Sequence, residues 1–509
     1  MSVGTVMDRG QSLCYLLKGL ADVLAANDCD VRGLTIDSRE ISVGDLFIAY
    51  CGERADGTQY IQDAIAAGAV AVVFDGDIEA VSVNQVPMIY VSELQRKVGV
   101  IASRFYEEPS QQLFVVGVTG TNGKTSCCHL LSQALQLNGD KCGVMGTLGY
   151  GLPDALQVAT HTTPNPVVLQ SHLKEMVEAG ASSVVLEVSS HALEQARVAA
   201  VSFDVAVFTN LTRDHLDYHG DLTAYGAAKQ KLFEMPGLSH AVINRDDAFG
   251  VQLLATLPRE VTTIAYGLLQ DSQDKAGLFA GGAQGVYGKV TRLDEAGIEM
   301  RVVTSWGDGV LRSEYLLGAF NASNLLAVLS VLLLMGLSLE KALVLLARVR
   351  NANGRMERLG GEGEQPLVVI DYAHTPDALQ NVLLALREHC GGRLVCLFGC
   401  GGDRDSGKRP LMGAVAAQYA DEIVITDDNP RSEDAALIVR DIMAGIETTK
   451  KVTVIHERAA AIRAALNNST AADVVVVAGK GHESFQQVGE QKRRFNDREC
   501  VQSILREVA

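Results

Sequence analysis

One loop of the chain has the residue types that hold the phosphates of a nucleotide. Its glycines let backbone N–H groups approach phosphate, its lysine reaches the β- and γ-phosphates, and its threonine hydroxyl can ligate Mg²⁺. The loop departs from the general spacing GxxxxGK[ST], because Val118 stands where that spacing has its first glycine. An ordinary glycine turn is the alternative. We predict that the nucleotide-binding residues are Gly120, Thr121, Asn122, Gly123, Lys124, Thr125 and Ser126.

The elements expected around this loop support the prediction. An apolar strand over Phe114–Val118 leads into the loop, and a helical period follows it over Cys127–Leu137. The loop is therefore expected at the carboxyl end of a strand and at the N-terminus of a helix. The dipole of that helix favours a bound phosphate.

Two further predicted strands end in residues that suit a Mg²⁺-nucleotide site. Glu187 lies within the strand Val184–Val188, and His215 follows the strand Val205–Thr209. The carboxyl ends of parallel strands meet at one edge of a sheet, where Mg²⁺-nucleotide sites occur. Read alone, each residue is a capping or hydrogen-bonding group, whereas beside a phosphate loop both become candidate metal-site residues. His215 and His219 also have a loose HxxxH metal spacing.

Four polar clusters follow predicted strands in the last third of the chain. Ligands of open parallel sheets bind outside the carboxyl ends of the strands, so the clusters are expected to converge on one edge. They mix guanidinium and carboxylate groups, which suits a zwitterionic ligand such as an amino acid. Helix caps and loop turns are the structural alternative. The clusters are Asp371–Pro376, Gly399–Asp405, Asp427–Arg431 and Gly479–Glu483.

The pattern predicts an α/β fold. Strands rich in Val and Ile alternate with helical periods, which indicates parallel sheets covered by helices on both faces. A length of 509 residues predicts about three domains. We place a small N-terminal α/β domain at residues 1–110, a central domain like the phosphate-loop ATPases at 111–350, and a C-terminal Rossmann-like domain at 351–509. Residues 270–315 are expected to form an antiparallel elaboration of the central domain.

Composition excludes several classes of protein. The chain is 47% hydrophobic and 21% charged, so it forms packed cores rather than remaining disordered. Its net charge of −17 argues against nucleic acid or an anionic membrane as a partner. The longest apolar run, Leu325–Leu339, is too short to span a bilayer and predicts a buried helix. The start lacks a signal-peptide pattern and the ten cysteines lack paired spacings, so we expect a cytoplasmic protein with free, mostly buried thiols.

Taken together, these motifs resemble those of the Mur ligases, the ATP-dependent amino-acid-adding enzymes of bacterial peptidoglycan synthesis. The phosphate loop matches the family's GTNGKT signature without change, and the resemblance runs in order through essentially the whole chain. It implies an N-terminal domain that binds a UDP-linked substrate, a central ATP-binding domain and a C-terminal amino-acid-binding domain. We also expect a monomer, with neither nucleic acid nor a membrane as a partner.

The resemblance implies chemical roles for residues of the central domain. Lys124, His215 and Lys229 match catalytic positions, while Thr125, Glu187 and His215 match positions that hold ATP phosphates and Mg²⁺, with two ions expected. Lys229 matches the lysine that family members carry as a carbamate formed with CO₂. That modification replaces a cation with a carboxylate, which can ligate Mg²⁺. Without the resemblance, an exposed helical lysine would be the simpler interpretation.

The nucleotide-sugar substrate implied by the resemblance is UDP-N-acetylmuramoyl-L-alanyl-D-glutamate (UDP-MurNAc-L-Ala-D-Glu). Residues that match the uridine-binding part of the N-terminal domain are Ile36, Ser38, Glu53, Arg54 and Ala55. Residues that match the surroundings of the muramoyl-dipeptide are His161, Thr162, Thr163, Ser189, Gln195 and Arg197. The chain departs from many relatives at two of these positions, with Glu53 in place of His and His161 in place of Asn.

The incoming amino acid implied by the resemblance is meso-diaminopimelate. The cluster Asp427–Arg431 contains the segment Asp-Asn-Pro-Arg, which in this family is associated with meso-diaminopimelate. Lysine-adding relatives usually lack its arginine. A guanidinium can grip the distal carboxylate, which diaminopimelate has and lysine lacks. The residues that match this pocket are Arg404, Asp428, Asn429, Pro430, Arg431, Gly479 and Glu483.

The reaction implied is amide-bond synthesis through an acyl phosphate of the D-glutamate carboxylate, which the amine of the amino acid then attacks. Three alternatives stay open at this point. A lysine-adding Mur ligase and a folylpolyglutamate synthetase-like enzyme belong to the same ligase class. The second would need neither a uridine-binding domain nor the Asp-Asn-Pro-Arg segment. A nucleotide-driven switch ATPase belongs to a different class.

Overall fold

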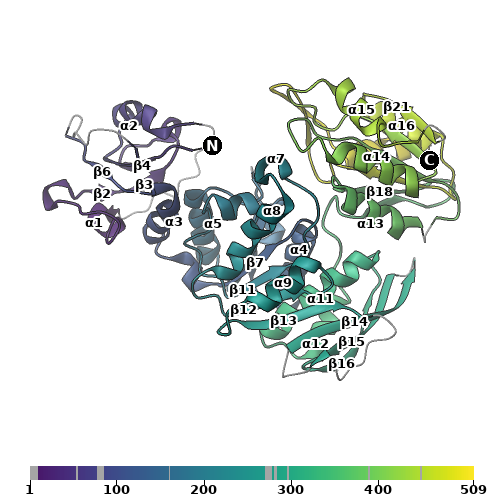
Figure 1. The fold of residues 1–509 in the computed structure, drawn as a ribbon, viewed down its shortest axis with the longest axis horizontal. Coiled ribbons are helices and arrows are strands. Elements are labelled where there is room, and N and C mark those ends of the chain that lie inside the picture. The colour runs from purple at the N-terminus through teal and green to yellow at the C-terminus, as the bar shows by residue number, and fades with distance from the viewer. Residues whose placement is uncertain are drawn as a thin grey trace. The chain divides into compact units, whose positions relative to one another are not determined.

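The structure is a computed structural model (Figure 1), and it describes residues 10–52, 55–76, 85–159, 161–269, 278–279, 284–294, 297–387, 390–447 and 450–508. The chain divides into two compact units, each assembled from separate segments. The first consists of Met1–Thr119, Gly139–Ala206 and Ala228–Ser239, and the second of Gly120–Asn138, Val207–Ala227 and His240–Ala509. The α/β fold class is as predicted, with three main sheets.

The sheet nearest the N-terminus has four parallel strands in sequence order. Apolar residues of α1 and α3 pack on one face of this sheet, and those of α2 pack on the other. The strands are β3 (Gly33–Thr35), β4 (Asp45–Ala49), β5 (Ala71–Phe74) and β6 (Met88–Tyr90). The other elements are β1 (Gln11–Ser12), α1 (Leu13–Leu16), η1 (Ala25–Asn27), β2 (Asp30–Val31), η2 (Ser38–Glu40), η3 (Gly57–Tyr60), α2 (Ile61–Ala67) and α3 (Leu94–Phe105).

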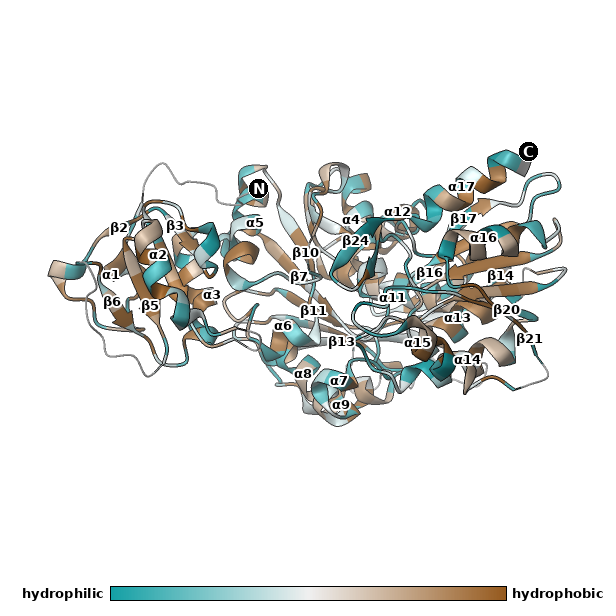
Figure 2. Ribbon diagram, turned by 90° about the horizontal axis from the view of Figure 1, so that it is seen from above, coloured by the Kyte–Doolittle hydropathy of each residue, from teal (hydrophilic) through white to brown (hydrophobic). Residues whose placement is uncertain are grey.

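The largest sheet has ten strands in the order β16-β15-β14-β13-β12-β11-β7-β10-β8-β9, and the division between the two units passes through β11. Its inner strands are continuous apolar runs and are mostly brown in Figure 2, as parallel strands covered on both faces should be. The strands are β7 (Phe114–Thr119), β8 (Cys142–Gly146), β9 (Gly149–Gly151), β10 (Ser183–Glu187), β11 (Val205–Phe208), β12 (His240–Asn244), β13 (Thr262–Leu268), β14 (Gln284–Asp294), β15 (Gly297–Thr304) and β16 (Gly307–Ser313).

The elaboration expected over residues 270–315 is antiparallel, as predicted. β15 pairs antiparallel with both β14 and β16, and these strands extend the large sheet beyond β13 to form one of its edges. Residues 270–277 and 280–283 lie outside the described residues.

The helices of this central region include the one that follows the phosphate loop. They are η4 (Pro109–Gln112), α4 (Lys124–Asn138), η5 (Pro153–Ala155), α5 (Pro166–Glu178), α6 (Ser190–Glu194), α7 (Leu216–His219), α8 (Leu222–Gln230), η6 (Lys231–Glu234), α9 (Ala248–Thr256), α11 (Ala319–Leu334) and α12 (Leu339–Leu346). Cys127 and Cys128 lie buried on α4. All ten cysteines fall within the described residues, none of them is in a disulfide, and half of them are buried.

The helix predicted over Leu325–Leu339 is buried but has different bounds. α11 ends at Leu334 because Gly336 turns the chain with φ +87°, a left-handed conformation that favours glycine. Ser338 then caps α12, since its side chain accepts a hydrogen bond from the N–H of Lys341. Across the described ranges we find no helix with both the length and the apolar character needed to cross a membrane.

The C-terminal sheet has six strands in the order β17-β18-β22-β19-β20-β21, and all but β17 are parallel. Helices α13, α14 and α15 pack on one face, and α16 and α17 pack on the other. The strands are β17 (Glu357–Gly360), β18 (Leu367–Asp371), β19 (Leu394–Phe398), β20 (Glu422–Ile425), β21 (Lys451–Val454) and β22 (Val474–Ala478), with a separate hairpin of β23 (Phe485–Val488) and β24 (Gln491–Arg494). The helices are α13 (Pro376–Arg387), α14 (Lys408–Tyr419), α15 (Ala435–Met443), α16 (Arg458–Asn467) and α17 (Asp497–Val508).

Candidate functional site

The phosphate loop is held by the segment that follows β11. The N–H of Thr121 donates to the carbonyl of Asn210 at 2.8 Å, and the N–H of Asn122 donates to the Asn210 side chain at 2.9 Å. The Thr209 hydroxyl donates to the carbonyl of Asn122 at 2.6 Å. Two N–H groups expected to wrap phosphate are therefore bonded within the protein. The loop is therefore positioned by the segment that follows a neighbouring strand.

The glycines of this loop are required by its geometry. Gly120 has φ +151° and Gly123 has φ +86°, in the region that L side chains rarely adopt. A Cβ atom at Gly120 would overlap the Thr209 hydroxyl, and one at Gly123 would lie 2.8 Å from the Asn324 amide oxygen. The loop can therefore keep this close approach to its neighbours only with glycine at both positions.

Lys124 and Thr125 begin α4 with their side chains in defined positions. The Lys124 ammonium donates to the carbonyls of Gly120 and Thr121, both at 2.8 Å, so it lies over its own loop. The Thr125 hydroxyl accepts a hydrogen bond of 3.0 Å from Nη2 of Arg355. Arg355 was not among the predicted site residues, although it lies in a basic stretch, and its guanidinium also stacks over the Tyr372 ring at 4.4 Å.

Asp214 is the centre of a buried charged cluster near this loop's anchoring segment. Lys408 Nζ lies 3.2 Å from its Oδ1, while His215 Nε2 and His374 Nε2 lie 3.3 and 3.6 Å from its Oδ2. Burial by itself would raise the pKa of the Asp214 carboxyl, but the hydrogen bond from His374 and the charge of Lys408 hold that pKa well below its usual range. Asp214 is thus a buried carboxylate with one ammonium and two imidazole groups around it.

The two histidines of the HxxxH spacing both contact Tyr225. His215 has a left-handed backbone with φ +53° and directly precedes α7, and its ring lies edge-on to Tyr225 at 6.2 Å. The His219 ring lies 5.1 Å from the same tyrosine. Within the described ranges we find no group of three or more His, Cys, Asp or Glu side chains placed to hold a metal ion. A metal site of the predicted type draws on Thr125 and a modified lysine as well.

The predicted metal-site residues fall in different compact units. Thr125 and His215 belong to the second unit, and Glu187 and Lys229 belong to the first. Glu187 ends β10, where its carboxylate accepts hydrogen bonds from the N–H and the hydroxyl of Thr147 at 2.8 and 3.1 Å. Lys229 lies in α8 and is only 1% exposed, so the simpler interpretation as an exposed helical lysine is wrong.

Residues predicted around the muramoyl-dipeptide gather near Glu187. The Thr163 hydroxyl donates to the Glu187 carbonyl at 2.7 Å and lies 3.3 Å from the Ser189 hydroxyl. Arg197 donates to the Thr163 carbonyl at 2.8 Å and to the Gln195 side chain at 2.9 Å. The Thr162 and Thr147 hydroxyls lie 3.1 Å apart. The structure therefore brings together Thr162, Thr163, Ser189, Gln195 and Arg197, while His161 is exposed beside them.

The residues predicted to bind uridine lie in the N-terminal sheet region. Ile36 packs against the core between the sheet, α1 and α3, and Ser38 begins η2. Ala55 is exposed, and its carbonyl accepts a hydrogen bond of 2.9 Å from the N–H of Gly52. Glu53 and Arg54 lie outside the described residues.

The four polar clusters of the C-terminal domain converge on the carboxyl edge of its sheet, as predicted. They follow the parallel strands β18, β19, β20 and β22. The N–H of Gly479 donates to the Asp371 carbonyl at 3.1 Å, and Asn429 Nδ2 donates to Glu483 Oε2 at 2.9 Å. Gly479 has φ +108°, and a Cβ there would lie 2.8 Å from Asp428 Oδ2. The predicted amino-acid pocket is therefore one continuous group of residues.

The two arginines of this pocket lie close enough to influence each other. Arg431 has φ +54°, and its Nη1 donates to the Gly402 carbonyl at 2.6 Å. Burial lowers the pKa of the Arg431 guanidinium and the positive charge of Arg404 lowers it further, while Asp428 and Glu483 oppose that shift. Cations and carboxylates thus meet at one edge of the sheet, which is the arrangement that a zwitterion needs.

Two buried cations behind this pocket were missed by sequence reasoning. Lys480 is 0% exposed and donates to Glu483 Oε2 at 2.6 Å and to Asn429 Oδ1 at 3.1 Å. Arg458 is also 0% exposed and forms two hydrogen bonds with Asp497 at 2.7 and 2.8 Å. Lys480 lies inside the predicted cluster Gly479–Glu483, so its place in the sequence could have identified it as a site residue. Arg458 begins α16, and nothing in its neighbourhood in the sequence marks it.

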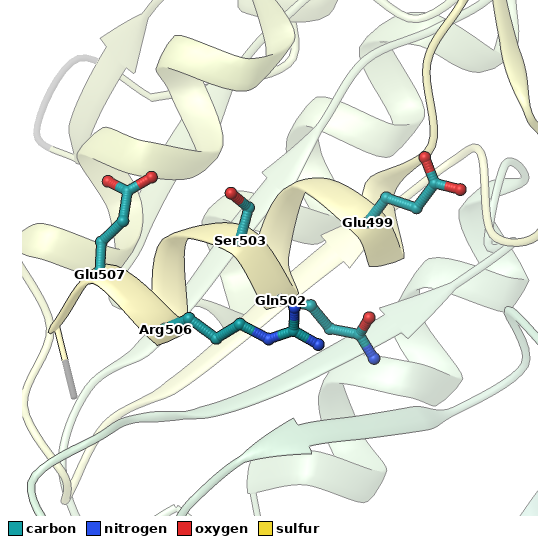
Figure 3. Close-up of a pocket in the computed structure, with 5 residues that line it drawn as sticks. All are labelled: Glu499, Gln502, Ser503, Arg506 and Glu507. Carbon is teal, nitrogen blue, oxygen red and sulfur yellow. The ribbon is translucent and has the colours of Figure 1, made fainter.

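A further pocket lies at the surface, and none of the predicted site residues lines it. It is lined by side chains of one helix, α17, and Figure 3 shows them projecting from that helix. The lining residues are Glu499, Gln502, Ser503, Arg506 and Glu507.

Comparison with protein families gives matches along most of the chain. The Mur ligase middle domain matches residues 118–332, and the glutamate ligase domain of Mur ligases matches residues 354–481. A third match, described as the Mur ligase family catalytic domain, covers residues 30–106.

Individual relatives match nearly end to end. The UDP-N-acetylmuramoyl-L-alanyl-D-glutamate–2,6-diaminopimelate ligase of Ectopseudomonas mendocina is 52% identical over 92% of this chain and 93% of its own length. The enzyme of the same name from Coxiella burnetii is 47% identical over 97% of this chain and 100% of its own length.

Solved structures give the same picture. A structure of a UDP-N-acetylmuramoyl-L-alanyl-D-glutamate–2,6-diaminopimelate ligase superposes with a TM-score of 0.67 at 33% identity, covering 98% of this chain and 99% of that one. A Mycobacterium tuberculosis folylpolyglutamate synthase superposes with a TM-score of 0.57 at 18% identity over 74% of this chain and 91% of its own. That second likeness shows a common fold only.

Proposed function

The chain belongs to the Mur ligase family, and from that premise we propose that it is an ATP-dependent ligase that adds meso-diaminopimelate to UDP-MurNAc-L-Ala-D-Glu. The product would serve peptidoglycan precursor synthesis, and we place the enzyme in the cytoplasm as a monomer. The close relatives named for this reaction and the matching solved structure support the assignment.

The roles of the three domains follow from their residues. We assign the uridine part of the substrate to residues 1–110, ATP and the muramoyl-dipeptide to residues 111–350, and the amino acid to residues 351–509. The phosphate loop and α4 support the central assignment, and the converging clusters support the last one. These boundaries fall close to the ends of the three family matches.

The observation that carries the substrate assignment is the mixture of charges at the carboxyl edge of the C-terminal sheet. Arg404 and Arg431 offer positive charge to a carboxylate, and Asp428 and Glu483 offer negative charge to an ammonium group. meso-Diaminopimelate carries a carboxylate and an ammonium at each end, so it uses both kinds of partner. A guanidinium can bind a carboxylate through two parallel hydrogen bonds, which suits recognition of the distal end.

The residues present fit a Mg²⁺-nucleotide complex. The loop glycines keep positive φ values, Lys124 lies over the loop, and the Thr125 hydroxyl is an oxygen ligand at the start of α4. We assign Mg²⁺ to Thr125, Glu187, His215 and Lys229 in its carbamate form, with two ions expected. Mg²⁺ supplies neutralisation of charge on the phosphate oxygens.

The reaction joins two substrates through an activated carboxyl group. The γ-carboxylate of the D-glutamate residue attacks the γ-phosphorus of ATP, forming a C–O–P bond as the bond to ADP breaks. Lys124 stabilises the negative charge that develops on the transferred phosphoryl oxygens. The neutral amine of the amino acid then attacks the acyl carbon, inorganic phosphate leaves, and the amine loses a proton. Most of the protein's contribution is to position these groups in line.

One assay tests the proposal directly. Purified protein with ATP and Mg²⁺ is given UDP-MurNAc-L-Ala-D-Glu together with meso-diaminopimelate or lysine, and in a separate reaction it is given a folate together with glutamate. Phosphate release is measured in each reaction and in one without any acceptor. We expect release that needs both the UDP substrate and meso-diaminopimelate. Release with lysine would indicate a lysine-adding enzyme, release with a folate and glutamate would indicate a folylpolyglutamate synthetase, and release without any acceptor would indicate a switch ATPase.

A further inference from the structure

We propose that Lys480 is a positioning residue for the incoming amino acid. Its buried ammonium group holds the Glu483 carboxylate and the Asn429 amide in the geometry that receives an ammonium group of the substrate. The inference rests on the proposed function, because it takes Glu483 as a contact of that amino acid.

Three side chains form a closed hydrogen-bonded triangle at this edge of the sheet. Lys480 comes two residues after β22 and is fully buried. Its Nζ donates to Glu483 Oε2 at 2.6 Å and to Asn429 Oδ1 at 3.1 Å. Asn429 Nδ2 donates to the same Glu483 oxygen at 2.9 Å. Each member of the triangle therefore fixes the orientation of the other two.

The backbone anchors this triangle at further points. Asn429 Oδ1 also accepts a hydrogen bond from the N–H of Gln487 at 2.9 Å. The N–H of Glu483 donates to the Lys480 carbonyl at 3.0 Å, and Asn496 Nδ2 donates to the Glu483 carbonyl at 3.2 Å. The triangle is consequently tied to the strand end, to the Asp-Asn-Pro-Arg segment and to the hairpin of β23 and β24.

Glu483 pairs with Lys480 rather than with Arg458, the other buried cation nearby. Arg458 has its own carboxylate, Asp497, with hydrogen bonds of 2.7 and 2.8 Å, and it donates to the Ala478 carbonyl at 2.9 Å. A buried ammonium is costly unless it is paired. Glu483 is therefore the carboxylate partner of Lys480, with 2.6 Å between Lys480 Nζ and Glu483 Oε2.

This pairing leaves one oxygen of Glu483 for a ligand. Lys480 and Asn429 both donate to Oε2, and in the ranges that the structure covers Oε1 has no hydrogen-bond donor. A carboxylate fixed through one oxygen presents the other in a single direction. We infer that Lys480 makes Glu483 a preformed acceptor, so that little conformational freedom is lost when the substrate ammonium binds.

A double-mutant cycle tests this role in the full-length enzyme. The variants are Lys480→Met, Glu483→Gln and the double variant, and the readouts are kcat and the KM values for meso-diaminopimelate, ATP and UDP-MurNAc-L-Ala-D-Glu. We expect each single variant to raise the KM for meso-diaminopimelate by about tenfold or more, with the other two KM values within about twofold. We expect the double variant to match Glu483→Gln within about twofold, because Lys480 acts through that carboxylate.

The outcomes separate this inference from the proposed function. An unchanged KM for meso-diaminopimelate in Glu483→Gln would remove the proposed pocket, and the inference with it. If Glu483→Gln raises the KM for meso-diaminopimelate and the double variant raises it further, the proposed pocket stands but the positioning role of Lys480 is overturned. Parallel increases in all three KM values for Lys480→Met would also overturn it, since they would indicate general loss of structure. If Lys480→Met does not fold, Lys480→Gln, which keeps a donor for Asn429 without the charge, takes its place in the same cycle.

Discussion

Lys408 Nζ lies 3.2 Å from Asp214 Oδ1, although 194 residues separate them in the chain, and the two side chains are only 6% and 5% exposed. Asp214 follows a strand of the large sheet, and Lys408 begins α14 beside the C-terminal sheet. The pair therefore joins the loop after β11, beside the proposed nucleotide site, to the helix that follows one cluster of the proposed amino-acid pocket.

Removing the cation of this pair should destabilise the protein. Lys408→Met leaves a buried carboxylate without its ammonium partner, which typically costs about 3–5 kcal/mol. We expect a lower midpoint of thermal unfolding for Lys408→Met, and partial recovery in the double variant Lys408→Met/Asp214→Asn, in which the charge is removed as well. The exposed Lys341→Met on α12 is the control. A double variant that is less stable than Lys408→Met would contradict this account of the pair.

Lys124→Ala should cripple phosphoryl transfer while leaving the UDP substrate bound. The Lys124 ammonium is proposed to contact the phosphates of ATP. Losing one preorganised electrostatic contact of this kind typically lowers kcat by a factor of about 10²–10³. We expect binding of UDP-MurNAc-L-Ala-D-Glu, measured by titration calorimetry, to stay within about threefold of the wild type. Lys341→Ala is again the control. Equal loss of both properties in a folded variant would mean that the domain assignment is wrong.

Lys229→Ala should nearly abolish activity, and short carboxylic acids should restore part of it. The side chain is 1% exposed, so an alanine leaves a space in which formate or acetate can supply the missing carboxylate. The measurement is kcat with increasing acetate for Lys229→Ala. Lys231→Ala, whose side chain pairs with Glu194 at the surface, is the matched control and should behave as the wild type does. Unchanged turnover in Lys229→Ala without added acid would rule out the carbamate role.

Arg431→Ala should remove most of the preference for meso-diaminopimelate over lysine. Lysine leaves the guanidinium without an anionic partner, and losing such a contact costs about 2–5 kcal/mol, which is on the order of a hundredfold or more in kcat/KM. The variant should lose this preference through weaker use of meso-diaminopimelate rather than better use of lysine. Both kcat/KM values are measured, with the exposed Arg440→Ala as control. A wild-type ratio in Arg431→Ala would show that Arg431 does not read the distal carboxylate.

Asp473 should make the C-terminal domain sensitive to acid. Burial opposes its charged form, but hydrogen bonds from Arg393 and Thr470 outweigh burial and lower the pKa of Asp473 to about 2. A carboxyl whose folded pKa lies below its unfolded value stabilises the protein fully above the unfolded pKa, near 4. It loses that contribution as the pH falls toward 2, a difference of about 2 kcal/mol.

The corresponding experiment compares the free energy of unfolding at several pH values. Between about pH 4.5 and 3, stability of the wild type should fall more steeply than that of Asp473→Asn, because the variant has no proton to gain at this position. Asp421→Asn, at an exposed carboxylate beside the same sheet, serves as the control. Parallel pH profiles for wild type and Asp473→Asn would exclude the lowered pKa as a source of stability.

The sequence by itself determined the local elements and the residues at their ends. The strands predicted over Phe114–Val118 and Val205–Thr209 correspond to β7 and β11 within one residue, and β7 and α4 flank the phosphate loop as predicted. Hydrophobic period, glycine and capping residues are local signals, which is why they can be read along the chain. The convergence of the four C-terminal clusters was also predictable, because parallel strands place their carboxyl ends together.

The tertiary structure decided which distant side chains meet. No local pattern pairs Lys408 with Asp214, turns Arg355 toward Thr125, or closes Lys480 against Glu483 and Asn429 in the interior. A charged residue in a sequence is by default solvated, and it becomes a buried partner only where the packing of whole elements removes water from it. That removal depends on strand order and helix placement across hundreds of residues, so these contacts belong to the fold rather than to any segment of the chain.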